Sequence, residues 1–212
     1  MANYVKSVLY IEEKYVEKVS DCLRSDEADV DFNNLIPMPD WVMRDCYGKE
    51  ADSLSAYRYL HGYSMDMNMC SLVNMYQHKG ENLDDVISRL EREGYIDLKL
   101  GERAFLNEQK HGDTSWYLWT FKNWGTKYNA VRTGWKKNKV YFETPWSAPF
   151  PIFQALAERF PDAVIECVYA GEDIGNCGCL ILKDGCIASE FYPERDTDEA
   201  KRIYQEVWEV DE

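Results

Sequence analysis

The sequence predicts an α+β protein in which an antiparallel sheet is interrupted by a large helical insertion. Two observations support this prediction. A strand-helix-strand pattern occurs near each end of the chain, and the long stretch between the two patterns has helical character but no clear strand pattern. With 212 residues, 45% of them hydrophobic, the chain is long enough for one substantial core or for one domain with a large insertion.

The first strand-helix-strand pattern occupies the N-terminal part of the chain. Alternating β-branched and aromatic residues predict a strand at residues 4–11. A helix should follow, because apolar residues recur at helical spacing from Tyr15 to Leu23. Residues 30–36 resume an extended pattern that Pro37 ends, since proline cannot continue a strand ladder.

The insertion is expected to be helical. Its clearest helix is predicted at residues 82–93, where Asn82 can cap the first turn and Gly94 stops the helix. A methionine-rich segment from Ser64 to Tyr76 is interpreted as core filling rather than as a soft binding surface, because methionine mainly fills irregular gaps in cores.

The C-terminal part is expected to contain a strand, a helix ended by Pro161, a further strand, a hairpin and a last helix. The hairpin should turn at Asp184-Gly185, since Asp-Gly between apolar runs is a strong signal for a tight turn. The elements are predicted at residues 139–143, 152–160, 163–169, 179–182 with 187–191, and from Thr197 onward.

Two strand-helix-strand units that share one antiparallel sheet form the ferredoxin-like plan. We therefore expect a ferredoxin-like antiparallel sheet with a large helical insertion between the second and third strands, and an extra C-terminal hairpin and helix. The predicted domains are a sheet domain (1–40 plus 137–193), a helical insertion (41–136) and a C-terminal helix that docks on the body (194–212).

Several motifs resemble the Api92-like proteins of phages and plasmids. They are Asp31-Phe-Asn-Asn-Leu-Ile-Pro-Met-Pro39, Trp116-Tyr-Leu-Trp119, Asn123-Trp-Gly-Thr-Lys127, Phe142-Glu-Thr-Pro-Trp146 and Phe160-Pro161. The resemblance covers most of residues 30–190 and implies a ferredoxin-like domain and a mobile-element origin. No established activity comes with this family, so the resemblance assigns no catalytic residue.

Charge and composition restrict the classes of partner. The formal net charge of −14 disfavours generic duplex binding and favours attraction of a basic protein. No stretch approaches the roughly 18 apolar residues of a membrane span, and the first residues do not form a signal peptide, so we expect a cytoplasmic protein without a membrane partner. Seven cysteines, an odd count in a chain of this size, indicate reduced thiols.

The candidate ligand site is the stretch at residues 121–140, which holds six basic residues and no acidic one, whereas residues 141–212 hold five basic and sixteen acidic residues. Cations hold phosphates and aromatic rings stack on bases, so the stretch could bind a phosphate or a single-stranded nucleic acid. In the structural alternative, the cations lie against the acidic surface of the chain and the rings connect the helical block to the sheet. The candidate residues are Lys122, Asn123, Trp124, Lys127, Tyr128, Arg132, Trp135, Lys136 and Lys137.

The cysteines offer a weaker alternative, a zinc site made of Cys167, Cys177, Cys179 and Cys186. The Cys-x-Cys spacing is unusual for structural zinc, and thiols on strands often serve as small apolar residues, so we expect no metal and no other cofactor. The chain has no Gly-x-Ser-x-Gly elbow and no His-Glu-x-x-His pair. A non-enzymatic role is therefore favoured over catalysis.

The leading hypothesis is a non-enzymatic accessory protein of a phage or mobile element that binds a host or phage macromolecule. The expected partner is a protein, bound through the acidic surface or the helical block, and an anti-defence role is one option. The alternative is a nucleic-acid or nucleotide-binding module that uses residues 121–140. The sequence leaves the oligomeric state open.

Overall fold

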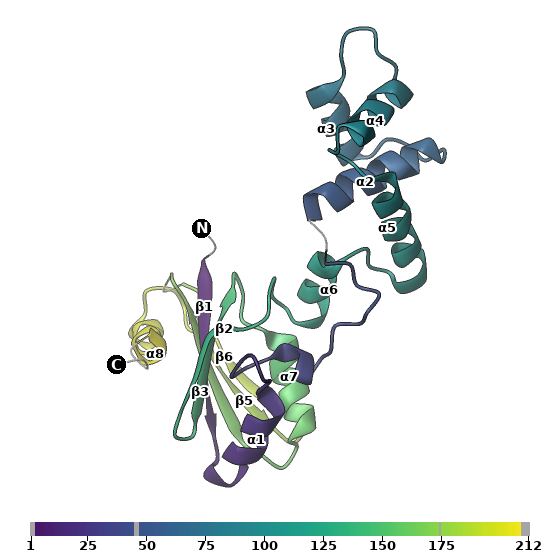
Figure 1. Cartoon of the computed structure of the whole chain (residues 1–212). Helices are drawn as coiled ribbons and strands as arrows, with labels where there is room; N and C mark the ends of the chain where they lie inside the picture. Colours follow the sequence, from purple (N-terminus) through teal and green to yellow (C-terminus); the bar gives the residue numbers. More distant parts are fainter. Residues whose placement is uncertain (1–2, 45–46, 174, 209–212) are drawn as a thin grey trace. The chain divides into compact units, whose positions relative to one another are not determined.

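The computed structural model describes residues 3–44, 47–173 and 175–208 (Figure 1). The chain divides into two compact units, which are Met1–Met38 with Thr120–Glu212, called here the sheet unit, and Pro39–Trp119, called the helical unit. The chain therefore rejoins the sheet unit at Thr120, earlier than residue 136, where the sequence analysis ended the insertion.

Six strands in the described part of the chain form one antiparallel sheet in the order β2-β3-β1-β4-β5-β6. The first four have the strand order of the ferredoxin-like fold, and β5 with β6 adds the expected hairpin, so the predicted fold class is confirmed. The strands are β1 (Tyr4–Ile11), β2 (Val131–Lys136), β3 (Lys139–Pro145), β4 (Ile165–Gly171), β5 (Cys177–Lys183) and β6 (Cys186–Phe191).

The second strand is not where the sequence analysis placed it. Residues 30–36 contain a short 3-10 helix, η2 (Phe32–Asn34), in place of a strand. The Asp31 carboxylate accepts hydrogen bonds from the backbone N–H of Asn33 (2.9 Å) and from the side-chain amide of Asn129 (2.7 Å). Side-chain bonds of this kind give the backbone an alternative to strand pairing.

The true second strand is β2, which lies inside the stretch that was assigned to the helical insertion. It pairs with β3 across an irregularity between Val131 and Gly134. Position 134 requires glycine, because the Cβ atom of any other residue would lie 2.2 Å from the hydroxyl oxygen of Tyr141 and clash with it. The insertion therefore precedes the second strand of the sheet, and the prediction that it follows that strand was wrong.

Helices cover both faces of the sheet (Figure 1). The short η1 (Glu13–Tyr15) leads into α1 (Val16–Leu23), which lies with α7 (Phe150–Arg159) on one face, and α8 (Asp198–Trp208) lies on the other. Apolar side chains of α8 pack on β1, β4 and β5. The buried residues between α8 and the sheet are Val8, Val168, Ala170, Cys177, Ala200, Ile203 and Val207.

The helical unit is built from α2 (Tyr47–Leu60), α3 (Met67–Tyr76), α4 (Leu83–Arg92) and α5 (Leu98–His111), while α6 (Trp116–Asn123) crosses the boundary between the units. The predicted helix at residues 82–93 is confirmed as α4. Its cap is Asn82, whose side chain accepts a hydrogen bond from the N–H of Asp85 (2.9 Å), and Gly94 follows it with φ of 80°.

Close packing of α2 against α5 depends on Gly101. A Cβ atom at this position would lie 2.2 Å from the backbone carbonyl oxygen of Ser53. The Ser53 hydroxyl in turn accepts a hydrogen bond from the N–H of Asp97 (2.9 Å), which fixes the start of α5 against α2. The two helix backbones cannot approach in this way with a larger residue at 101.

We expect Gly101→Ala to lower the free energy of unfolding by about 1–3 kcal/mol, because α2 and α5 must separate to accommodate the methyl group. The matched control is Gly48→Ala in α2, where nothing lies within 4 Å of the added Cβ. The control should be neutral or stabilising by up to about 1 kcal/mol, since alanine favours helix over glycine. Urea unfolding followed by circular dichroism measures both, and equal stability of Gly101→Ala and the wild type would contradict the packing described.

Candidate functional site

The conspicuous tryptophan of the basic stretch, Trp124, is part of the core. Its side chain is 3% exposed, its indole N–H donates to the carbonyl of Ile36 (2.9 Å), and its ring meets the edge of Phe32. Gly125, which follows Trp124, has a positive φ of 75°. Trp124 therefore holds the turn after α6 to the segment before the insertion, which gives its side chain a role in the fold.

The other candidates divide between the two faces of the sheet. Trp135 lies on the α1 face, where its indole N–H donates to the carbonyl of Asp29 (3.2 Å) and the Arg24 guanidinium lies 5.2 Å from its ring. Arg132 lies on the α8 face, bonded to the Glu143 carboxylate, which raises the pKa of the arginine. A ligand on one face could not contact both side chains.

The remaining candidates lie at the ends of elements. Lys122 and Asn123 end α6, and the exposed Lys136 and Lys137 stand at the turn between β2 and β3. The nine candidates thus do not form one continuous surface of the sheet.

One group within the stretch does come together. The ammonium of Lys127 lies 5.1 Å from the ring of Tyr128 and 4.8 Å from the ring of Trp146. Trp146 was quoted only as part of a family motif and was missed as a candidate site residue. Its φ of 71° is rare for a bulky residue and is the kind of backbone strain that often occurs at functional sites.

The four cysteines of the zinc alternative do not meet. Cys177 and Cys179 lie beneath α8, whereas Cys167 pairs with Leu9 and faces the opposite side of the sheet, and Cys186 is exposed at the start of β6. Burial raises the pKa of Cys167 well above its usual value and that of Cys179 to about 11, so both remain protonated thiols. Among the described residues no group of three or more His, Cys, Asp or Glu side chains is arranged to hold a metal ion.

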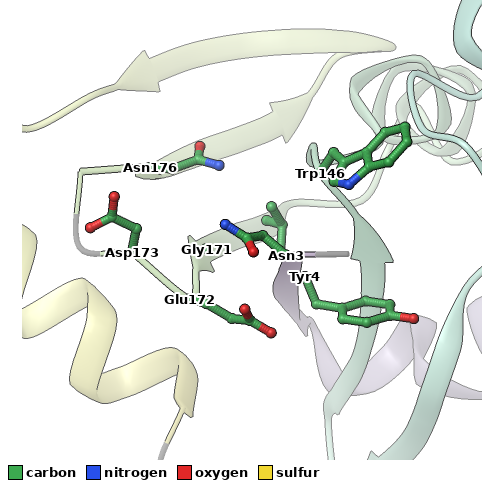
Figure 2. A pocket seen from close by; sticks show the side chains of 8 residues that line it. Asn3, Tyr4, Trp146, Gly171, Glu172, Asp173 and Asn176 are labelled. Carbon is green, nitrogen blue, oxygen red and sulfur yellow. The ribbon is translucent and has the colours of Figure 1, made fainter. Parts of the chain in front are cut away.

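A pocket of about 470 Å³ opens at the end of the sheet where β1 begins and β4 ends (Figure 2). Backbone hydrogen bonds join its walls: the N–H of Trp146 donates to Asn3 (2.8 Å), that of Glu172 to Tyr4 (3.0 Å) and that of Gly171 to Asn176 (2.6 Å). Its lining comes from four separate segments, which is why the sequence did not reveal it. The lining residues are Asn3, Tyr4, Val5, Trp146, Gly171, Glu172, Asp173 and Asn176.

A second candidate surface lies on α3 in the helical unit. Met69 is buried, as core filling requires, but Met67 is 86% exposed and Met75 is 72% exposed, so that interpretation was wrong for these two residues. The reason is the helical period, because residues 67, 71 and 75 lie on the side of the helix away from Met69 and Leu72. The exposed residues of α3, called here the α3 face, are Met67, Asn68, Cys70, Ser71, Asn74 and Met75.

The α3 face is uncharged, and α3 itself contains no charged residue. Hydrogen bonds hold both ends of the helix. At the start, the Asp66 carboxylate accepts from the N–H of Met69 (2.8 Å). At the end, the Arg89 guanidinium donates to the carbonyl of Tyr76 (2.7 Å) and to both oxygens of Glu81 (3.0 Å each). The helix that presents the methionines is therefore fixed in position on α4.

The Glu81–Arg89 pair makes a pH-dependent contribution to stability. Hydrogen bonds from Arg89 lower the pKa of Glu81 from 4.5 to about 2. A carboxylate with a lowered pKa in the folded state stabilises the fold above its unfolded pKa, and this contribution is lost as the pH falls towards the folded pKa. We expect Glu81→Gln to be less stable than the wild type at about pH 6, with a difference that shrinks between pH 4.5 and about 2.

Urea unfolding at a series of pH values measures this difference. Glu102→Gln, at an exposed position of α5, is the matched control and should show a small difference that does not change with pH. A deficit of Glu81→Gln that stayed constant down to about pH 3 would show that Glu81 acts by packing rather than by charge.

The sheet order, with α1 and α7 on one face, defines a ferredoxin-like domain. Residues 123–211 match the sequence model of the ferredoxin-like domain in Api92-like protein. This part of the chain is thus similar to the ferredoxin-like domain of Api92-like proteins, as the resemblance seen in the sequence implied.

The crystal structure of the protein Api92 from Yersinia pseudotuberculosis is similar, with a TM-score of 0.47 and 11% sequence identity over 93% of this chain and 100% of that chain. A comparison with curated proteins gives no match. In the described part of the chain, no helix is long and apolar enough to span a membrane.

Proposed function

We propose that this chain acts by binding another protein, and that the α3 face of the helical unit is the contact surface. The observation that supports the proposal is the exposure of Met67 and Met75 on a helix without a charged residue. The solvent face of a surface helix is ordinarily polar and charged. An exposed face that departs from this pattern suits a partner that covers it.

Two features of the α3 face, its exposed methionines and its lack of charge, match the cores of protein interfaces. The cores of such interfaces are depleted in charged residues and enriched in methionine and aromatic residues. Methionine side chains are flexible and polarisable, so they adapt to the shape of a partner. Each fully buried methionine would contribute about 1.5–3 kcal/mol to binding, so two of them could account for much of a micromolar affinity.

The net charge of −14 indicates the kind of protein partner. A basic partner is attracted over long range by an acidic protein, and salt weakens this attraction. We therefore propose a basic host or phage protein as the partner and an accessory role in a phage or mobile element. The acidic surface would speed the encounter, and the α3 face would supply the contact.

The test is affinity capture from a lysate of the host by the wild type and by a variant with Met67→Lys and Met75→Lys. Two charges on exposed positions leave the fold unchanged but oppose burial against a partner. We therefore expect the double variant to capture at least tenfold less of the partner than the wild type does. Quantitative mass spectrometry measures the captured amounts at low and moderate salt. A basic partner should be captured less well as the salt concentration rises.

The matched control is Leu106→Lys, which places the same charge at a 57% exposed apolar position on α5 of the helical unit. This variant should capture the same protein as the wild type does. Equal capture by all three proteins would remove the α3 face from the proposal, and no specific capture by the wild type would remove protein binding altogether.

The nucleic-acid alternative has a separate test at the basic stretch. Lys136 and Lys137 are exposed at the turn between β2 and β3. If the stretch binds single-stranded nucleic acid, Lys136→Glu with Lys137→Glu should abolish a gel shift that the wild type gives at low salt. The absence of a shift with wild-type protein and single-stranded DNA or RNA would end this alternative.

A further inference from the structure

The pocket at the end of the sheet has the size and the mixed lining of a small-molecule site. Its volume of about 470 Å³ falls within the range of about 300–1,000 Å³ that is usual for such sites. The sheet backbone holds it open, because its walls are the hydrogen-bonded ends of β1, β3, β4 and β5. A pocket with such walls is preformed and requires little rearrangement to accept a ligand.

The pocket offers both donors and acceptors that the protein itself does not use. Within the described part of the chain, no hydrogen bond satisfies the indole N–H of Trp146, the Glu172 carboxylate or the side-chain amides of Asn3 and Asn176. A carboxylate only accepts, an indole only donates, and a carboxamide does both. A ligand that suits this set must itself carry several groups that can donate and accept.

Two of the acidic groups near the pocket are paired with arginines, and Glu172 is an additional negative charge. Asp173 forms an ion pair with Arg195 (3.1 Å), and the pKa of Arg132 is raised by its bond to Glu143 and, more weakly, by Glu172. A phosphate in the pocket would meet two carboxylates, Glu172 and Asp173, and no basic residue in the lining. An anion is therefore disfavoured, and a neutral ligand that donates a hydrogen bond to Glu172 fits this lining.

Two aromatic rings complete the lining, and each already has one neighbour: the Arg132 guanidinium lies 4.5 Å from the Tyr4 ring, and Phe121 stacks on Trp146. Trp146 and Tyr4 lie on one side of the pocket, and Asn176, Asp173 and Glu172 lie around the end of β4 on the other (Figure 2). The strained backbone of Trp146, with φ of 71°, places its indole at this rim. Aromatic side chains provide apolar area with a polar tip, which suits a ring that has C–H groups as well as hydroxyls.

We propose that this pocket binds the ring of a neutral sugar through its neighbouring hydroxyl groups. Glu172 and the two asparagines would bond the hydroxyls, Trp146 would donate its N–H, and the aromatic rim would pack against the C–H groups of the ring. The sugar could belong to a free glycan or to a nucleoside, since both present neighbouring hydroxyls. The proposal is independent of the α3 face, and failure of one leaves the other standing.

Saturation-transfer NMR with glucose, N-acetylglucosamine, maltose and adenosine as probes tests the proposal on the full chain. At concentrations on the order of 10 mM, even a millimolar Kd gives a signal. We expect saturation of at least one probe, and the comparison of adenosine with the other three identifies the source of the sugar. No signal from any of the four probes would overturn the proposal.

Two variants locate the binding. Glu172→Gln keeps the shape of the side chain but removes its charge, and Trp146→Gly removes the indole while glycine tolerates the positive φ, so the fold is retained. Both should weaken binding about tenfold or more, because each loses hydrogen bonds or contact area to the ligand. The control, Glu17→Gln at an exposed position of α1, should bind as the wild type does. Unchanged binding by Glu172→Gln and Trp146→Gly would place any sugar elsewhere and overturn the proposal.

Discussion

The sheet unit depends on the pairing of β1 with β3 on one side and with β4 on the other, along almost its whole length. Because β1 is central, both of its faces must be covered. Val5 and Leu9 are buried on the face of α1 and α7, and Val8 is buried beneath α8.

The lysine of β1 is also buried beneath α8. Lys6 is only 1% exposed, and its ammonium lies 5.3 Å from the Tyr141 ring and 5.7 Å from the Trp208 ring. The C-terminal helix is thus required to shield the second face of the central strand.

Local sequence patterns predicted the elements that local interactions determine. β1, β3 to β6, α4 and the final helix follow from alternation, helical spacing and turn residues, and their predicted bounds agree to within a few residues. The second strand could not be predicted in this way. Asp31 receives a hydrogen bond from Asn129, 98 positions further along the chain, and this contact stabilises a turn where the sequence alone shows an extended pattern. In β2, only glycine leaves room at position 134 for the side chain of Tyr141 on the neighbouring strand. Glycine weakens the prediction of a strand from sequence, although this strand requires it.

The candidate sites were harder to predict, for the same physical reason. The indole N–H groups of Trp124 and Trp135 bind carbonyls 88 and 106 positions away, so the sequence could not show that both rings serve the fold. The absence of charge in α3 was visible in the sequence, but which methionines face the solvent depends on the packing of α3 against its neighbours. Trp146 became a candidate site residue through its backbone conformation, its contact with Lys127 and its place in the pocket lining, none of which composition or spacing predicts.

The ends of the inserted segment lie close together within each unit. In the sheet unit, the bond from Trp124 to Ile36 brings the points of departure and return side by side, and in the helical unit the N–H of Trp116 donates to Met43 (3.0 Å). For the sheet unit, the insertion is equivalent to a loop whose two ends are held together. The entropic cost of closing such a loop grows by only about 0.6 kcal/mol for each doubling of the loop length. The inserted helices could therefore change in number or length at little cost to the sheet.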